Sequence, residues 1–183
     1  HDLETIFAFV NQGDGLEAEI ADDDTLLLDG EFAAGLQADD DNLVMRALRR
    51  LRQAGGVDRV PPLALRLTKN LPVAAGIGGG SADAAAMARL VRDHFLPEMS
   101  QAELERLVAP LGADVAACVG SRTCIGVGTG AELSSADEMD VSGMPILLVH
   151  PRKSVPTGPI FKAWAQVDRG ASRPSGSVRA ALT

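Results

Sequence analysis

The sequence predicts an α+β fold in which strands are concentrated at the start of the chain. Short runs that favour β-structure occupy residues 5–10, 18–20 and 25–28, separated by Gly13-Asp14-Gly15 and by three consecutive aspartates. Later segments place apolar side chains at intervals of three and four residues, which is the spacing of one helix face. A glycine-rich run over residues 76–80 lies between a predicted strand and a predicted helix. We therefore expect a strand-rich start with helices packed against it.

The first helix is predicted between a polar cap and a pair of glycines. Asn42 is a favoured N-cap residue, and Gly55 followed by Gly56 stops the helical spacing. The apolar stripe between them consists of Leu43, Val44, Ala47, Leu48 and Leu51. Residues 63–68 then alternate leucine with alanine, arginine and threonine, which predicts a strand that leads directly into the glycine-rich run.

Two further helices are predicted after the glycines. The apolar residues of the first fall at helical spacing: Ala84, Met87, Ala88, Val91 and Phe95. Ser100 and Glu103 form a capping box for the second helix, which Gly112 ends. Beyond it, "TCIGVG" and the apolar residues 146–150 are predicted as strands, with a polar loop over residues 134–143.

Composition and charge exclude several classes of protein. The formal net charge is -8, so no basic field attracts a nucleic acid or an anionic membrane. Apolar residues occur in short runs rather than in the ~20-residue block that a membrane span requires. Cys118 and Cys124 show no metal-ligand pattern, and we predict reduced, partly buried thiols in a cytoplasmic protein. We expect neither a nucleic acid nor a membrane as partner, and the oligomeric state is unknown from the sequence.

The glycine-rich run has the composition of a phosphate-binding loop. Four glycines and Ser81 lie between a predicted strand and an alanine-rich helix, and no charged side chain stands between Leu71 and Ala82. The first amides of a helix lack acceptors and attract anions, and glycine lets the backbone approach phosphate oxygens closely. Lys69 stands at the start of the stretch, and the first nearby carboxylate is Asp83. A tight turn with close strand–helix packing, or a flexible linker, is the alternative.

Two common nucleotide-binding motifs fit this run poorly. A Walker A loop requires a lysine after the glycines, and none follows here. A dinucleotide fingerprint requires glycine or alanine where Ser81 stands. A Rossmann-type oxidoreductase also needs a ribose-binding acid near the end of the next strand, and none is evident.

The string "KNLPVAAGIGGGSADAAA", residues 69–86, resembles the second motif of the GHMP kinases. Further blocks resemble that family in the right order, namely "HDLETIFAFV", "DDNLVMRAL", "LGADVAACVG" and "SVPTGPIF", so that the resemblance spans residues 2–161. The triple glycine followed by Ser-Ala-Asp-Ala-Ala is typical of the branch that phosphorylates 4-diphosphocytidyl-2-C-methyl-D-erythritol in non-mevalonate isoprenoid biosynthesis.

The resemblance implies a GHMP kinase two-domain fold with the active site between the domains. Residues 1–150 would form the N-terminal, ATP-binding domain without its first strands, and residues 151–183 the truncated start of a ferredoxin-like C-terminal domain. The implied reaction is transfer of the γ-phosphoryl group of ATP, with Mg²⁺, to the 2-hydroxyl of the cytidine diphosphate substrate. The family's first and third motifs are missing from this stretch, so we expect a fragment with negligible turnover on its own.

The same resemblance implies roles for individual residues. Asp114 matches the catalytic aspartate, although the residues alone are equally consistent with a helix cap there. Ser81 is a candidate Mg²⁺ ligand through Mg-ATP. The positions that match the cytidine pocket are His1, Phe7, Thr157 and Phe161. The triphosphate would be held by Pro72, Val73, Ala74, Ala75, Gly76, Ile77, Gly78, Gly79, Gly80, Ser81 and Ala82.

One departure and two alternatives remain at this stage. Residues 115–118 read Val-Ala-Ala-Cys where the family usually has Val-Pro-Phe-Phe, which puts the wall of the pocket in doubt. Another GHMP kinase, of the mevalonate or homoserine type, would share the ATP loop but not the cytidine pocket. An inactive nucleotide-binding fragment is the alternative outside enzyme function.

Overall fold

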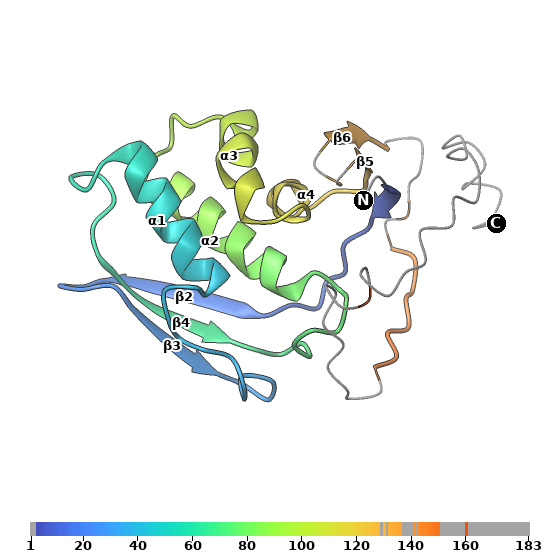
Figure 1. Ribbon diagram of the computed structural model, residues 1–183, viewed down its shortest axis with the longest axis horizontal. Helices are drawn as coiled ribbons and strands as arrows, with labels where there is room; N and C mark the ends of the chain where they lie inside the picture. The colour runs from blue at the N-terminus through green and yellow to red at the C-terminus, as the bar shows by residue number, and fades with distance from the viewer. Residues whose placement is uncertain are drawn as a thin grey trace.

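The computed structural model describes residues 3–128, 130, 132–136, 141, 143–150 and 160, and it contains both helices and strands (Figure 1). This mixture confirms the predicted α+β class. In chain order the elements are β1 (Leu3–Phe7), β2 (Gly15–Ile20), β3 (Thr25–Asp29), α1 (Leu43–Gly55), β4 (Leu63–Thr68), α2 (Gly79–Phe95), α3 (Gln101–Val108), the short 3₁₀ helix η1 (Ala109–Leu111), α4 (Val115–Gly120), β5 (Cys124–Gly128) and β6 (Glu132–Ser135).

The first sheet has the order β2-β4-β3, with β4 antiparallel to β2 and parallel to β3. Helices α1 and α2 cover one face of it, as Figure 1 shows. Leu63, Leu65 and Leu67 of β4 are buried in the core with apolar residues of both helices, whereas Arg66 between them is exposed. Successive side chains of a strand point to opposite faces, so the leucine alternation follows from one covered face.

The predicted caps are confirmed at the ends of the helices. The Asn42 side chain accepts the N–H of Val44 at 3.0 Å, and Gly56 with φ 89° follows the last turn of α1. Ser100 and Glu103 form the capping box of α3, which continues through η1 to Gly112. These local signals position α1, α2 and α3 where the apolar spacing predicts them.

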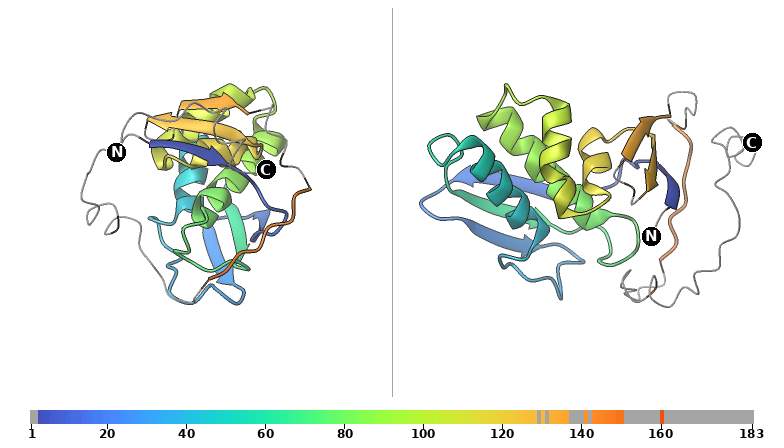
Figure 2. Two further views of the ribbon diagram at one scale, coloured as in Figure 1. Left: turned by 90° about the vertical axis from the view of Figure 1, so that its right-hand side faces the viewer. Right: turned by 45° about the horizontal axis from the view of Figure 1, so that its top comes forward.

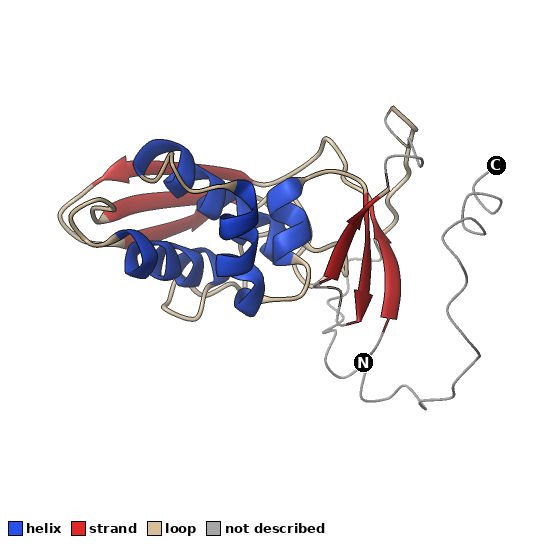
Figure 3. Ribbon diagram, turned by 90° about the horizontal axis from the view of Figure 1, so that it is seen from above, coloured by secondary structure: helices blue, strands red, loops and turns tan. Residues whose placement is uncertain are grey.

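The second sheet is antiparallel, with the order β1-β5-β6. Figures 2 and 3 show it beside α4, apart from the larger sheet. Phe7 at the end of β1 pairs in register with Cys124 at the start of β5. The sheet therefore brings the N-terminal strand next to the segment that follows α4.

Three predictions about the strands need correction. β1 ends at Phe7 rather than at residue 10, and Ser134 and Ser135 belong to β6 because they pair with β5. Residues 146–150 form no strand, and Leu147 and Val149 are 85% and 83% exposed. A strand requires a neighbour, and among the described residues none pairs with this segment.

The predicted second domain, residues 151–183, lies outside the described residues apart from residue 160. Among the described helices, none combines the length and the apolar content needed to cross a bilayer.

Candidate functional site

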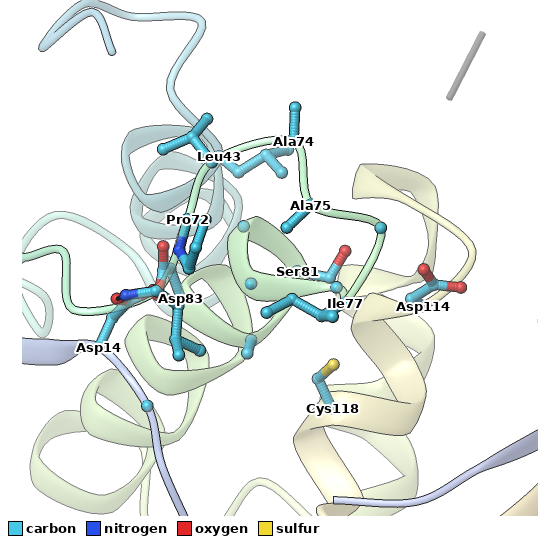
Figure 4. A pocket seen from close by; sticks show the side chains of 18 of the residues that line it. Asp14, Leu43, Pro72, Ala74, Ala75, Ile77, Ser81, Asp83, Asp114 and Cys118 are labelled. Carbon is cyan, nitrogen blue, oxygen red and sulfur yellow. Dashed lines mark hydrogen bonds between the residues drawn. The ribbon is translucent and has the colours of Figure 1, made fainter. Parts of the chain in front are cut away.

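A cleft of about 1360 Å³ opens beside the N-terminus of α2. Its lining includes the whole glycine-rich loop, residues 72–82, together with Phe7 of β1, Asp114 and Cys118 (Figure 4). These groups come from three separate parts of the chain, because Asp114 and Cys118 belong to the same short segment. The structure therefore brings the predicted triphosphate loop, the predicted catalytic aspartate and one predicted cytidine-pocket residue to one cavity.

The loop leaves the first amides of α2 without intrahelical acceptors. Gly78 is the N-cap residue, in the left-handed conformation with φ 72°, and no side chain caps the helix. Ala82 N–H donates to the Gly78 carbonyl at 2.9 Å, so the amides of Gly79, Gly80 and Ser81 precede the first helical bond. Those amides and the helix dipole favour a bound anion.

Glycine is required in this loop at two positions. Gly76 and Gly78 both have positive φ, 74° and 72°, and a Cβ added at either would meet no atom within 4 Å. The backbone is therefore open to a close ligand at these points. Ala74 also has positive φ, 53°, which is uncommon for a residue with a side chain.

Ser81 and Asp114 both line the cleft, and each lies at the start of a helix. Ser81 is in the first turn of α2, and Asp114 immediately precedes α4, as Figure 4 shows. The Asp114 side chain is exposed and makes no capping hydrogen bond, although it occupies the N-cap position. The helix-cap alternative is therefore not realised, and the carboxylate is available to a ligand in the cleft.

Two apolar groups form part of the wall. The Phe7 ring lies across β5 at Gly126, where an added Cβ would meet the ring at 2.6 Å. Cys118 lines the cleft one turn after Asp114, while Val115, Ala116 and Ala117 are buried. Burial raises the pKa of the Cys118 thiol to about 11, and the nearby Asp114 charge adds to this effect. The unusual Val-Ala-Ala-Cys segment thus contributes a neutral thiol to the wall.

Both cysteines are free and buried, more deeply than the partial burial predicted. The predicted site residues His1, Thr157 and Phe161 lie outside the described residues. Within the part of the chain that the structure describes, no group of three or more His, Cys, Asp or Glu side chains could hold a metal ion.

Sequence reasoning missed a buried ionic cluster below the loop. The Lys69 ammonium contacts both Asp14 and Asp83, and Lys69 is only 3% exposed. The pKa of Asp83 is raised to about 6, chiefly by burial and to a smaller extent by the Asp14 carboxylate, while Lys69 acts to lower it. Lys69 is thus not at the loop's surface. The sequence could have predicted the burial of Lys69, because it follows Leu63, Leu65 and Leu67 at the two-residue spacing of the buried face of the strand.

Comparison with known proteins identifies similar sequences and a similar structure. The family description "GHMP kinases N terminal domain" matches residues 42–122. A 4-diphosphocytidyl-2-C-methyl-D-erythritol kinase of Sphingopyxis alaskensis is 63% identical over 170 residues, which cover 93% of this chain and 60% of that protein. The enzyme of the same name from Novosphingobium aromaticivorans is 51% identical over 172 residues, 93% of this chain and 56% of that protein.

A crystal structure of 4-(cytidine 5'-diphospho)-2C-methyl-D-erythritol kinase superposes with a TM-score of 0.71 at 28% identity. The match covers 100% of this chain and 62% of that one. The chain thus spans somewhat under two thirds of the length of the relatives it matches.

Proposed function

Because this chain belongs to the GHMP kinase family, we propose that it carries the ATP-binding part of a small-molecule kinase. The proposed reaction of the whole protein transfers the γ-phosphoryl group of ATP to the 2-hydroxyl of 4-diphosphocytidyl-2-C-methyl-D-erythritol. Its proposed setting is isoprenoid biosynthesis in the cytoplasm. In this proposal residues 1–150 form the ATP-binding domain and residues 151–183 begin the second domain.

One observation carries the proposal: the unbonded amides at the start of α2 and the uncapped carboxylate of Asp114 line a single cleft. Phosphoryl transfer depends mainly on positioning and on stabilising charge at the phosphoryl oxygens. The amides of Gly79, Gly80 and Ser81 suit that task, since they are fixed donors at the positive end of a helix. The loop, residues 72–82, accordingly holds the triphosphate.

Mg²⁺ fits this site as a companion of the nucleotide rather than as a resident ion. The described residues contain no group of three or more His, Cys, Asp or Glu that could hold a metal ion, and in this proposal Mg²⁺ would be held by phosphate oxygens and the Ser81 hydroxyl. When bound, it neutralises charge on the phosphate groups. The Ser81 hydroxyl, in the first turn of α2, would supply a ligand from this chain.

Asp114 acts on the acceptor alcohol. Its carboxylate accepts the hydroxyl proton as the hydroxyl oxygen bonds to the γ-phosphorus and the bond to the β,γ-bridging oxygen breaks, which releases ADP. A positioned base of this kind contributes about 10² to 10⁴ in rate. Phe7, at the wall of the same cleft, borders the cytidine pocket, to which His1, Thr157 and Phe161 also belong in this proposal.

The test is a phosphorylation assay of the complete gene product with three alcohols: the cytidylyl substrate, mevalonate and homoserine. We expect turnover with the first only, and a loss of about 10²-fold or more in kcat for Asp114→Asn with nearly unchanged ATP affinity. Asp22→Asn, an exposed turn residue, is the matched control and should retain full activity. Preference for another alcohol, or full activity of Asp114→Asn, would overturn the proposal.

A further inference from the structure

Three charged side chains from three parts of the chain meet below the glycine-rich loop. Asp14 precedes β2, Lys69 follows β4, and Asp83 lies in the second turn of α2. Lys69 Nζ donates to Asp83 Oδ2 at 2.6 Å and also to the Asp14 carboxylate. The three side chains are 4%, 9% and 2% exposed for Lys69, Asp83 and Asp14. Figure 4 shows Asp14 and Asp83 close together, on the opposite side of the loop from Asp114.

This cluster is bonded to the residues that precede the loop and lies close to the first residue of α2. At the loop's start, Asp14 Oδ1 accepts the N–H of Asn70 at 2.6 Å and that of Leu71 at 2.9 Å. At its end, a Cβ added to Gly79 would lie 3.8 Å from Asp14 Oδ2 and 3.9 Å from Lys69 Nζ. Asp14 is therefore bonded to the segment that enters the loop and lies directly below the first residue of α2.

Charge attraction does not explain the cluster. Two carboxylates and one ammonium carry a formal charge of -1, which opposes an anion bound at the α2 amides. All three residues are among those that line the cleft, but the Lys69 ammonium is bonded to both carboxylates and its side chain is almost completely buried. The cluster instead satisfies two backbone amides at the sharp turn out of β4 and connects them to α2.

We propose that Asp14, Lys69 and Asp83 are positioning residues that hold both ends of the glycine-rich loop in the shape that presents the α2 amides to a phosphate group. This inference rests on the proposed nucleotide-binding function of the loop. In this inference the three residues line the cleft but neither bind the phosphate group nor take part in the chemistry. Their effect is transmitted through the loop backbone.

The direction in which one substitution changes nucleotide affinity distinguishes a positioning role from an electrostatic role. Asp14→Asn keeps the size of the side chain but removes a negative charge and weakens the bonds to Asn70, Leu71 and Lys69. Simple Coulomb attraction predicts tighter binding of a Mg²⁺–ATP analogue by this variant. Loss of positioning predicts weaker binding, and we expect the Kd to rise about tenfold with little change in the KM for the acceptor.

A second readout reports on the loop without any ligand. Hydrogen exchange in peptides spanning residues 68–80 of the complete gene product should be faster in Asp14→Asn than in the unaltered protein. The matched control is Asp24→Asn, because Asp24 also accepts a backbone N–H, that of Leu63, and pairs with an arginine far from the loop. This control should leave both the loop exchange and the nucleotide Kd within twofold.

The outcomes are distinguishable. Unchanged or tighter nucleotide binding together with unchanged loop exchange in Asp14→Asn overturns the positioning role while the proposed kinase function stands. Absence of nucleotide binding by the unaltered protein overturns the proposed function, and the loop exchange still decides whether the cluster holds the loop. If Asp14→Asn does not fold, Asp83→Asn replaces it, with the same direction expected in both readouts and a smaller change.

Discussion

β4 is held by a carboxylate at each of its ends, and the two attachments differ in burial and in charge balance. At its start, Asp24 accepts the N–H of Leu63 at 2.9 Å and pairs with Arg52. At its end, Asp14 accepts two backbone N–H groups and pairs with Lys69, which Asp83 also contacts. The first pair is partly exposed, and the second cluster is almost completely buried.

These differences in burial and charge balance distinguish a purely structural attachment, that of Asp24, from an attachment beside the candidate functional site, that of Asp14. Arg52 balances one carboxylate and uses its other donors on the carbonyls of Val60 and Pro61, so the charges and polar groups there are matched. The other end carries two carboxylates for one ammonium in a buried place, an arrangement that costs stability. Such local conflicts are expected where function rather than stability selects the residues.

The largest expected effect comes from removing the cation at each end. Lys69→Met leaves two carboxylates in contact inside the protein, and we expect it to lower the free energy of unfolding by about 3 to 5 kcal/mol. Arg52→Met leaves a partly solvated Asp24 that keeps its bond from Leu63, and its cost should be about 1 to 2 kcal/mol. Urea unfolding at pH 7 measures both. Equal losses at the two ends would show that burial and charge balance do not distinguish them.

The contributions of Asp83 and Asp24 to stability, at the two ends of β4, should change with pH in opposite directions. The folded pKa of Asp83 is about 6, above its ordinary value of 3.8, because burial disfavours its charge. The folded state therefore binds the proton more tightly, and stability falls as pH rises from about 4 to 6, by at most about 3 kcal/mol for one group. Burial also acts to raise the pKa of Asp24, but bonds from Arg52 and Leu63 outweigh it and hold this pKa below 3.8.

The ionised Asp24 carboxylate therefore stabilises the fold above pH 3.8, its ordinary pKa. This contribution to stability is lost when the pH falls below that value. Urea midpoints between pH 3 and 7 measure the two slopes. Asp83→Asn should remove the fall between pH 4 and 6, and Asp24→Asn should remove part of the loss at lower pH. A variant at either position that left the whole profile unchanged would contradict the corresponding prediction.

The sequence predicted elements whose causes are local. Asn42 and the pair Ser100 and Glu103 act on amides within three residues, so their caps were readable from spacing alone. The leucine alternation of β4 was readable because one covered face imposes it. Residues 146–150 have the composition of a strand, but pairing depends on a distant partner that composition does not reveal.

The site shows the same division. The loop before α2 was predicted from its glycines, whereas the role given to Asp114 came from family resemblance, because its residue context alone is equally that of a helix cap. Asp14 looked like a turn residue between two glycines, yet it meets Lys69, 55 residues further on, in the folded protein. Only the packing of β2, β4 and α2 brings such groups together.

The smallest expected effects come from two glycines, one in the loop and one at the far end of α1. Gly78 has φ 72° and ψ 16°, a left-handed helical conformation that alanine adopts at a cost of about 1 to 2 kcal/mol. Gly56 has φ 89° and ψ 148°, which lies nearer the region open to glycine alone, where strain is about 1 to 3 kcal/mol. Gly56→Ala should therefore destabilise the protein at least as much as Gly78→Ala. Only Gly78→Ala should weaken binding of a Mg²⁺–ATP analogue, because relief of its strain rotates the peptide groups that precede the α2 amides. Thermal unfolding and equilibrium binding measured on both variants test this prediction. It is contradicted if nucleotide affinity falls in proportion to the loss of stability in both variants.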